Sequence, residues 1–114
     1  MQQITTTGTL PHGLDITGVR YTGFVMREAL LGDMIEAEVE SGGAGNQIHY
    51  AAQLAVRQLV KVTDESGREF AGPFVVSMIR KRADFVALRT AQLALDKLGN
   101  AEPIASASTG TPSS

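Results

Sequence analysis

The chain has 114 residues, a formal net charge of −2 and no Cys. The length suits one domain, and the lack of Cys excludes disulfides, thiolate metal sites and Cys nucleophiles, in agreement with a reducing cytosol. The small net charge excludes a strong whole-molecule field for phosphate backbones, and the short apolar runs exclude a membrane span of about 20 residues. The amino terminus has neither the basic nor the apolar region of a signal peptide, so we expect no secretion by that route.

The first part of the chain carries the signals of a β-hairpin. The β-branched threonines among residues 5–9 favour an extended chain, and Pro11, Gly13 and Asp15 supply turn chemistry before a second extended run. These signals predict a hairpin over residues 3–28, with the turn close to Pro11, Gly13 and Asp15.

Apolar residues at helical spacing follow the hairpin. In the first such segment Met34, Ala37 and either Leu30 or Leu31, together with the neighbouring Ile35, form one stripe, while the acidic residues face outward. Gly-rich and polar segments separate this stretch from later ones of the same kind. The spacing predicts four helices, over about residues 30–40, 46–62, 73–81 and 84–98.

These elements predict an α+β domain over residues 1–100 that is mostly helical, with an N-terminal β-hairpin packed on about four α-helices. Gly99 and Asn100 are suited to cap the last helix at its carboxyl end. The segment that follows, AEPIASASTGTPSS at residues 101–114, is small and polar. Because it offers too little apolar surface to offset the entropy of ordering it, we predict a disordered C-terminal tail.

No constellation in the sequence is typical of an enzyme. The run at residues 42–45 could cradle a phosphate with backbone amides, but it lacks the rest of a dinucleotide or Walker motif and is also typical of a helix connector. His12 and His49 lack the further ligands of a metal site. Asp33 and Glu36 lie one helical turn apart, a spacing open to acid–base chemistry but common on exposed helices. We predict a protein that is not an enzyme and uses no metal or cofactor.

Basic residues are concentrated in one place and support an alternative function. Arg80, Lys81, Arg82 and Arg89 lie at the junction of two predicted helices, which could form a helix-turn-helix of a small DNA-binding regulator. Against this interpretation, the last predicted helix is apolar where base-reading Asn, Gln or Arg side chains would be expected.

The order of the elements, more than any single residue, resembles a phage family. An extended pair is followed by an Arg-Glu pair, Gly-Asp-Met, Ala-Glu, a Tyr on the next helix and finally Leu-Asp-Lys-Leu-Gly. Over residues 10–99 this order is similar to the tail assembly chaperones of Mu-like and P2-like contractile-tailed phages and related prophages. The matching positions are Arg27, Glu28, Gly32, Asp33, Ala37, Glu38, Tyr50, Leu54, Leu59, Asp84 and Leu88.

The resemblance implies a non-virion assembly factor in the cytoplasm of the bacterial host. Such a protein binds the tape measure protein, keeps its helical segments soluble and helps tail tube protein to polymerise around it; self-association is compatible with this role, and no nucleic acid or membrane is a partner. We expect an adaptable apolar groove for the partner at five residues: Met26, Leu31, Met34, Ile35 and Met78. The alternative, which is favoured for each residue taken singly, is that all five belong to the core. A structural tail or head-joining subunit is a third interpretation.

Overall fold

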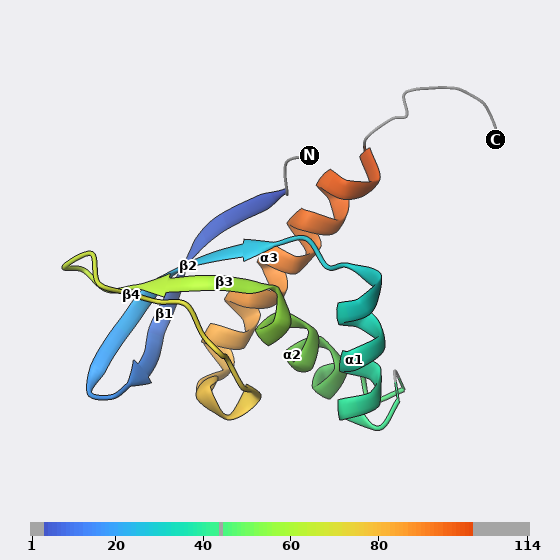
Figure 1. The fold of residues 1–114 in the computed structure, drawn as a ribbon, viewed down its shortest axis with the longest axis horizontal. Coiled ribbons are helices and arrows are strands. Elements are labelled where there is room, and N and C mark those ends of the chain that lie inside the picture. The colour runs from blue at the N-terminus through green and yellow to red at the C-terminus, as the bar shows by residue number, and fades with distance from the viewer. Residues whose placement is uncertain (1–3, 44, 102–114) are drawn as a thin grey trace.

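The computed structural model of the chain describes residues 4–43 and 45–101. Its strands form one antiparallel sheet in the order β1-β2-β3-β4. The helix α3 crosses one face of this sheet, and α1 and α2 lie side by side at one end (Figure 1). In chain order the elements are β1 (Thr5–Ile16), β2 (Val19–Arg27), α1 (Leu31–Ser41), α2 (Gln47–Gln58), β3 (Leu59–Thr63), β4 (Glu69–Phe70), the 3-10 turn η1 (Val76–Met78) and α3 (Arg82–Ala101).

The predicted hairpin is present, but its turn lies elsewhere. The chain reverses at Thr17 and Gly18, whose φ angles of 50° and 82° match the two left-handed positions of a tight hairpin turn. Pro11 and Gly13 instead lie inside β1, where the pairing register with β2 shifts between Thr9 and Leu14. An irregularity on an edge strand tolerates these residues, because the edge needs no proline N–H and the extra residues of β1 bend the strand.

The prediction of a mostly helical domain with about four helices is wrong. The described residues form three α-helices and four strands. The predicted helix over residues 46–62 ends at Gln58, and residues 59–63 become β3, which pairs with β2. This segment, LVKVT, is rich in β-branched residues and buries Leu59 and Val62, so pairing with the open edge of β2 overrides its helical spacing.

The predicted helix over residues 73–81 is also wrong, since only η1 forms there. Instead of supplying one helical stripe, the apolar residues of this segment reach different parts of the core from a largely extended chain. The Phe74 ring packs edge-on against Phe70 with centroids 5.5 Å apart, and Met78 and Ile79 contact the core further along.

The final helix was predicted over residues 84–98, whereas α3 runs from Arg82 to Ala101 and passes through the expected cap at Gly99 and Asn100. The prediction of this helix rested on the helical spacing of Leu88, Ala91, Leu95 and Leu98. The first three are buried against the sheet, as that spacing predicts, but Leu98 is half exposed. The predicted tail, apart from Ala101, lies outside the described residues.

The core between α3 and the sheet is mainly aliphatic and also encloses Tyr21 and Phe24. Its fully enclosed side chains come from elements far apart in the chain, including Leu10, Leu14, Met26, Val62, Leu88 and Leu95. No helix of the described part is long and apolar enough to cross a membrane.

Candidate functional site

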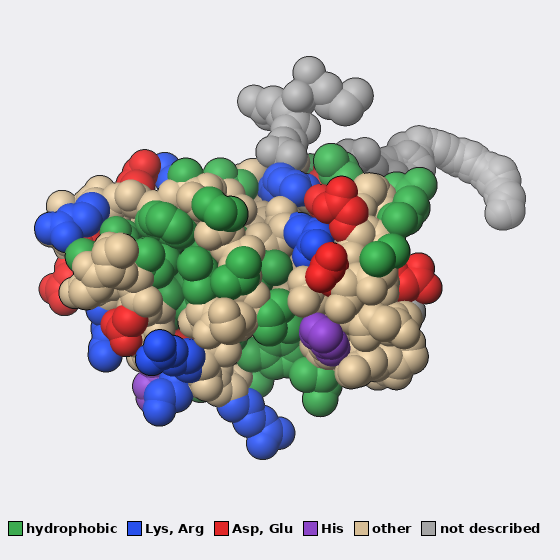
Figure 2. Space-filling view, turned by 60° about the horizontal axis from the view of Figure 1, so that its bottom comes forward, with side chains coloured by type: hydrophobic (Ala, Val, Ile, Leu, Met, Phe, Trp, Pro, Cys, Tyr) green, Lys and Arg blue, Asp and Glu red, His purple; other side chains and the backbone are tan. Residues whose placement is uncertain are grey.

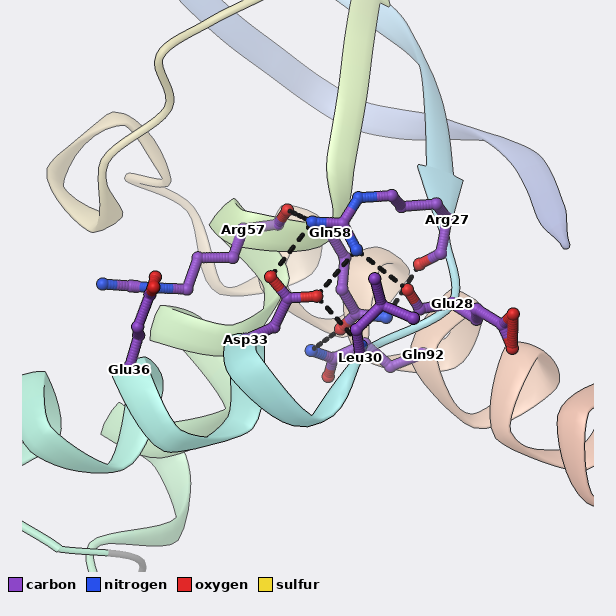
Figure 3. Close-up of polar contacts among 8 residues, drawn as sticks. All are labelled: Arg27, Glu28, Leu30, Asp33, Glu36, Arg57, Gln58 and Gln92. Carbon is purple, nitrogen blue, oxygen red and sulfur yellow. Dashed lines mark hydrogen bonds and ion pairs between the residues drawn. The ribbon is translucent and has the colours of Figure 1, made fainter. Parts of the chain in front are cut away.

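The helix α1 is attached to the rest of the protein by a polar clamp. The Arg27 guanidinium at the end of β2 donates to both carboxylate oxygens of Asp33, at 2.7 and 3.0 Å. The same guanidinium also donates to the backbone carbonyls of Glu28 and Arg57, at 3.0 and 2.8 Å. Asp33 in turn accepts the backbone N–H of Leu30 at 2.9 Å, which satisfies an orphan donor at the start of the helix (Figure 3).

Two positions of the family resemblance, Arg27 and Asp33, are therefore brought together as a two-pronged ion pair. Their side chains are only 20% and 14% exposed. The hydrogen bonds from Arg27 hold the pKa of Asp33 below its ordinary value, against the opposing effect of burial, and the same bonds raise the pKa of Arg27. The clamp is thus a charged contact across the whole neutral pH range.

A buried amide chain extends the clamp to α2 and α3. Gln58 Nε2 donates to the Arg27 carbonyl at 3.0 Å, and its Oε1 accepts from Gln92 Nε2 at 2.9 Å. Gln92 Nε2 also donates to the Ala51 carbonyl at 3.1 Å. Both glutamines are at most 2% exposed, so each bond replaces water that the site excludes (Figure 3). Four elements are tied together at this point.

The clamp leaves α1 with its apolar side facing solvent. The side that faces the protein carries Asp33, Ala37 and Ser41, and only the last two of these are buried. On the opposite side three large apolar residues follow each other at intervals of four, with 72%, 53% and 73% of their surface exposed: Leu31, Ile35 and Val39. We call these three residues the α1 stripe; Figure 2 shows hydrophobic side chains, with acidic ones beside them, at this end of the molecule.

This orientation corrects the predicted one. The sequence placed Met34, Ile35 and Ala37 on a single stripe opposite the outward-facing acidic residues, but Ile35 and Ala37 lie about 200° apart around the helix, at about 100° per residue. Ala37 is inward and fully buried, Ile35 is outward, and Met34 lies at the margin with 37% of its surface exposed.

The five predicted partner-binding residues do not form one groove. Leu31, Met34 and Ile35 share α1, as expected, with Met34 beside the stripe. Met26 is fully buried in the core, and Met78 is half buried in η1 beside Gly13 and Arg20. The alternative that these methionines are core residues holds for Met26.

Sequence reasoning missed Val39, although its position four residues after Ile35 is the signal that could have found it.

A hollow lies on the other side of the α1–α2 pair, between α2 and the segment that leads to α3. Its larger part, about 520 Å³, has Val56, Leu59 and Phe74 among its lining residues, with Glu36 and Glu40 at one side. A second part of about 290 Å³ continues past Val76 toward the start of α3. Hydrophobic side chains are visible across the middle of this face in Figure 2.

The basic residues do not form the predicted helix-turn-helix. Arg80, Lys81 and Arg82 are exposed at the start of α3, but only a 3-10 turn precedes them. Arg89 lies about two turns further along α3, where its guanidinium donates to Gln92 Oε1 at 3.1 Å. The scaffold on which the DNA-binding alternative rested is absent from the described residues, and we do not carry that alternative forward.

The glycine-rich connector serves the end of α1. Gly42 is left-handed, with φ of 79°, and its N–H donates to the Val39 carbonyl at 3.3 Å. The N–H of Gly43 donates to the Glu38 carbonyl at 2.9 Å. These amides satisfy helix carbonyls, as in a left-handed helix cap, and so are not directed at a phosphate.

The histidines and acidic residues considered for chemistry are dispersed. His12 lies in β1 and His49 in α2. The carboxylate of Asp84 accepts the backbone N–H groups of His12 and Gly13, at 2.8 and 3.4 Å, and so pins the bulged strand to α3. Within residues 4–43 and 45–101 no group of three or more His, Cys, Asp or Glu side chains is placed to hold a metal ion.

Comparisons with protein-family models, with curated proteins and with solved structures found no match. The geometry of α1 and the resemblance in residue order are therefore the two observations that bear on function.

Proposed function

We propose that this chain is a phage tail assembly chaperone that acts by binding and makes or breaks no covalent bond. In this proposal it holds apolar helical segments of the tape measure protein in the cytoplasm of the bacterial host. It assists polymerisation of the tail tube around that protein, and it is absent from the mature virion. Two independent lines support the proposal: the family-like residue order over residues 10–99 and the exposed α1 stripe.

The α1 stripe is the observation that carries the proposal. A helix normally turns its apolar side toward the core, whereas α1 turns Leu31, Ile35 and Val39 away from it. Apolar residues at intervals of four on one helix are the anchors by which helices pack against each other. Met34 beside the stripe adds a flexible side chain that can adapt to imperfect partners. Such a surface suits a protein that binds several similar helical segments of a long partner.

Coexpression with the tape measure protein of the same phage tests this proposal. We expect the wild-type chain to copurify with the tape measure protein and to raise its soluble yield. The Ile35→Asp variant should lose both effects, because it places a charge in the middle of the stripe. Leu93 on α3 is 53% exposed, as Ile35 is, so Leu93→Asp is a matched control that should behave as wild type. Equal binding by the two variants would remove α1 from the interface.

Mass spectrometry of purified virions separates a chaperone from a structural subunit. We expect peptides of the tail tube and tape measure proteins in the particles and none from this chain. If this chain is present in fixed ratio to the tail tube protein, it is a tail or head-joining component, and the chaperone proposal fails.

A further inference from the structure

The smaller part of the hollow carries a chemistry opposite to that of α1. Ile79 and Phe85 contribute to its apolar floor, and Ile48, which is 73% exposed, stands at its margin. The consecutive cations of residues 80–82 line it as well. None of these three cations has a carboxylate within 4.0 Å in the described part of the chain. We call this hollow the basic groove.

The helix α1 has the complementary chemistry. It contains four carboxylates and no Lys or Arg. Asp33 and Glu36 are paired with Arg27 and Arg57, while Glu38 and Glu40 have no ion-pair partner among the described residues. Both lie toward the carboxyl end of the helix, where the helix dipole adds further negative potential and no basic side chain offsets it.

The two surfaces also agree in length. Leu31 and Val39 are eight residues apart, which is about 12 Å along a helix. The wall that α2 gives to the hollow repeats the same interval, with Ile48 in the basic groove and Val56 in its larger neighbour, again about 12 Å apart. The three anchors of the α1 stripe can therefore lie along this wall, with the acidic end of α1 beside residues 80–82.

We propose that the α1 stripe of one copy of this chain docks into the basic groove of a second copy. The clamp holds α1 with its stripe turned outward, and Figure 2 shows Lys and Arg gathered at the lower left of the molecule, away from the end formed by α1. The contact is therefore made between molecules. It joins two different surfaces, so each added copy leaves one stripe and one groove open, and the product is a ring or an open chain.

This contact uses the same stripe as the proposed chaperone function, so a tape measure helix and a second copy would compete for it. Self-association does not need the phage partner, because it takes place in the purified chain alone. A failure of self-association would leave copurification with the tape measure protein untouched, and the reverse also holds.

Sedimentation velocity from about 1 μM to about 1 mM tests the contact, since this range covers weak to moderate interfaces. The wild-type chain is expected to grow in mass with concentration, and high salt should reverse the growth. Ile35→Asp disables only the stripe and Ile48→Asp only the groove, so each is expected to stay monomeric. Leu93→Asp should associate as wild type. All three side chains are more than half exposed, and circular dichroism with thermal unfolding verifies that each variant is folded.

The decisive sample is an equimolar mixture of Ile35→Asp and Ile48→Asp. One variant retains a groove and the other a stripe, so the mixture is expected to form a 1:1 dimer and nothing larger. The proposal is overturned if the wild-type chain stays monomeric throughout the range. It is equally overturned if Ile48→Asp associates as wild type, which would indicate pairing of one α1 with another, or if the mixture stays monomeric.

Discussion

Replacing Asp33 by Ala tests whether the polar clamp holds α1 in place. The variant loses both bonds from Arg27 and the bond from the Leu30 N–H. A lost helix cap costs about 1 kcal/mol, and a hydrogen bond to a charged group contributes about 1.5–3 kcal/mol. Arg27 keeps the carbonyls of Glu28 and Arg57 as acceptors. The loss of its bonds to Asp33 should therefore cost an amount at the lower end of about 1.5–3 kcal/mol. The expected decrease in the free energy of unfolding is about 2–3 kcal/mol.

Urea and thermal unfolding followed by circular dichroism measure this decrease. For a domain of this size the loss corresponds to a midpoint temperature about 10–20 °C lower. Glu36→Ala is the matched control on the same helix, because the Glu36 side chain is 68% exposed in its contact with Arg57 and should contribute less than about 1 kcal/mol. Equal midpoints for Asp33→Ala and Glu36→Ala would refute the idea that the clamp anchors α1.

The contribution of Asp33 should also depend on pH in one direction. Its pKa is lower in the folded chain than in the unfolded one, mainly because of the hydrogen bonds from Arg27. Its stabilising effect is therefore complete above the unfolded pKa of about 3.9 and is lost as the pH falls through the folded value. The stability difference between wild type and Asp33→Ala should be constant near neutrality and shrink in acid. A difference that grows in acid would contradict the assignment.

Three further substitutions should change the free energy of unfolding, which urea unfolding measures for each variant. Gln92→Leu should destabilise by about 1–3 kcal/mol, because it leaves the buried Gln58 Oε1 without the N–H that Gln92 donates to it. Gly8→Ala should cost about 1–3 kcal/mol, since the new Cβ would lie 2.5 Å from the Phe24 ring and force it to move. Thr17→Asn should stabilise by a few tenths to about 1 kcal/mol, because Asn accepts the left-handed first position of this turn better than a β-branched residue.

The sequence predicts the elements whose periodicity has a single interpretation. The stripe of Leu88, Ala91 and Leu95 fits only a helix, and α3 is present. Residues 59–63 carry an ambiguous pattern, because Leu59 and Val62 continue the helical spacing of α2 and also suit a half-buried strand. The unpaired edge of β2, formed far away in the chain, decides between the two, and local sequence does not contain that information.

The orientation of α1 could not be predicted for a related reason. Periodicity identifies an apolar stripe but assumes that this stripe faces inward. Here the inward contact is made by Asp33 with Arg27, assisted by Gln58 and Gln92, and these residues come from four elements. A polar docking surface frees the apolar one for solvent, so the face available to a partner is the one that periodicity alone would assign to the core.

Polar docking also predicts that α1 is the most easily detached helix of the fold. It buries only Ala37 and Ser41, whereas α3 buries Leu88 and Leu95 among others. Native-state hydrogen exchange should therefore show α1 amides opening at a lower free energy than those of α3. In Asp33→Ala the protection of α1 should fall by a further factor of about 30–140, the equivalent of about 2–3 kcal/mol at about 1.4 kcal/mol per tenfold change. If α1 and α3 amides exchange with one common free energy in both proteins, α1 opens only with the whole domain and its attachment does not depend on the clamp.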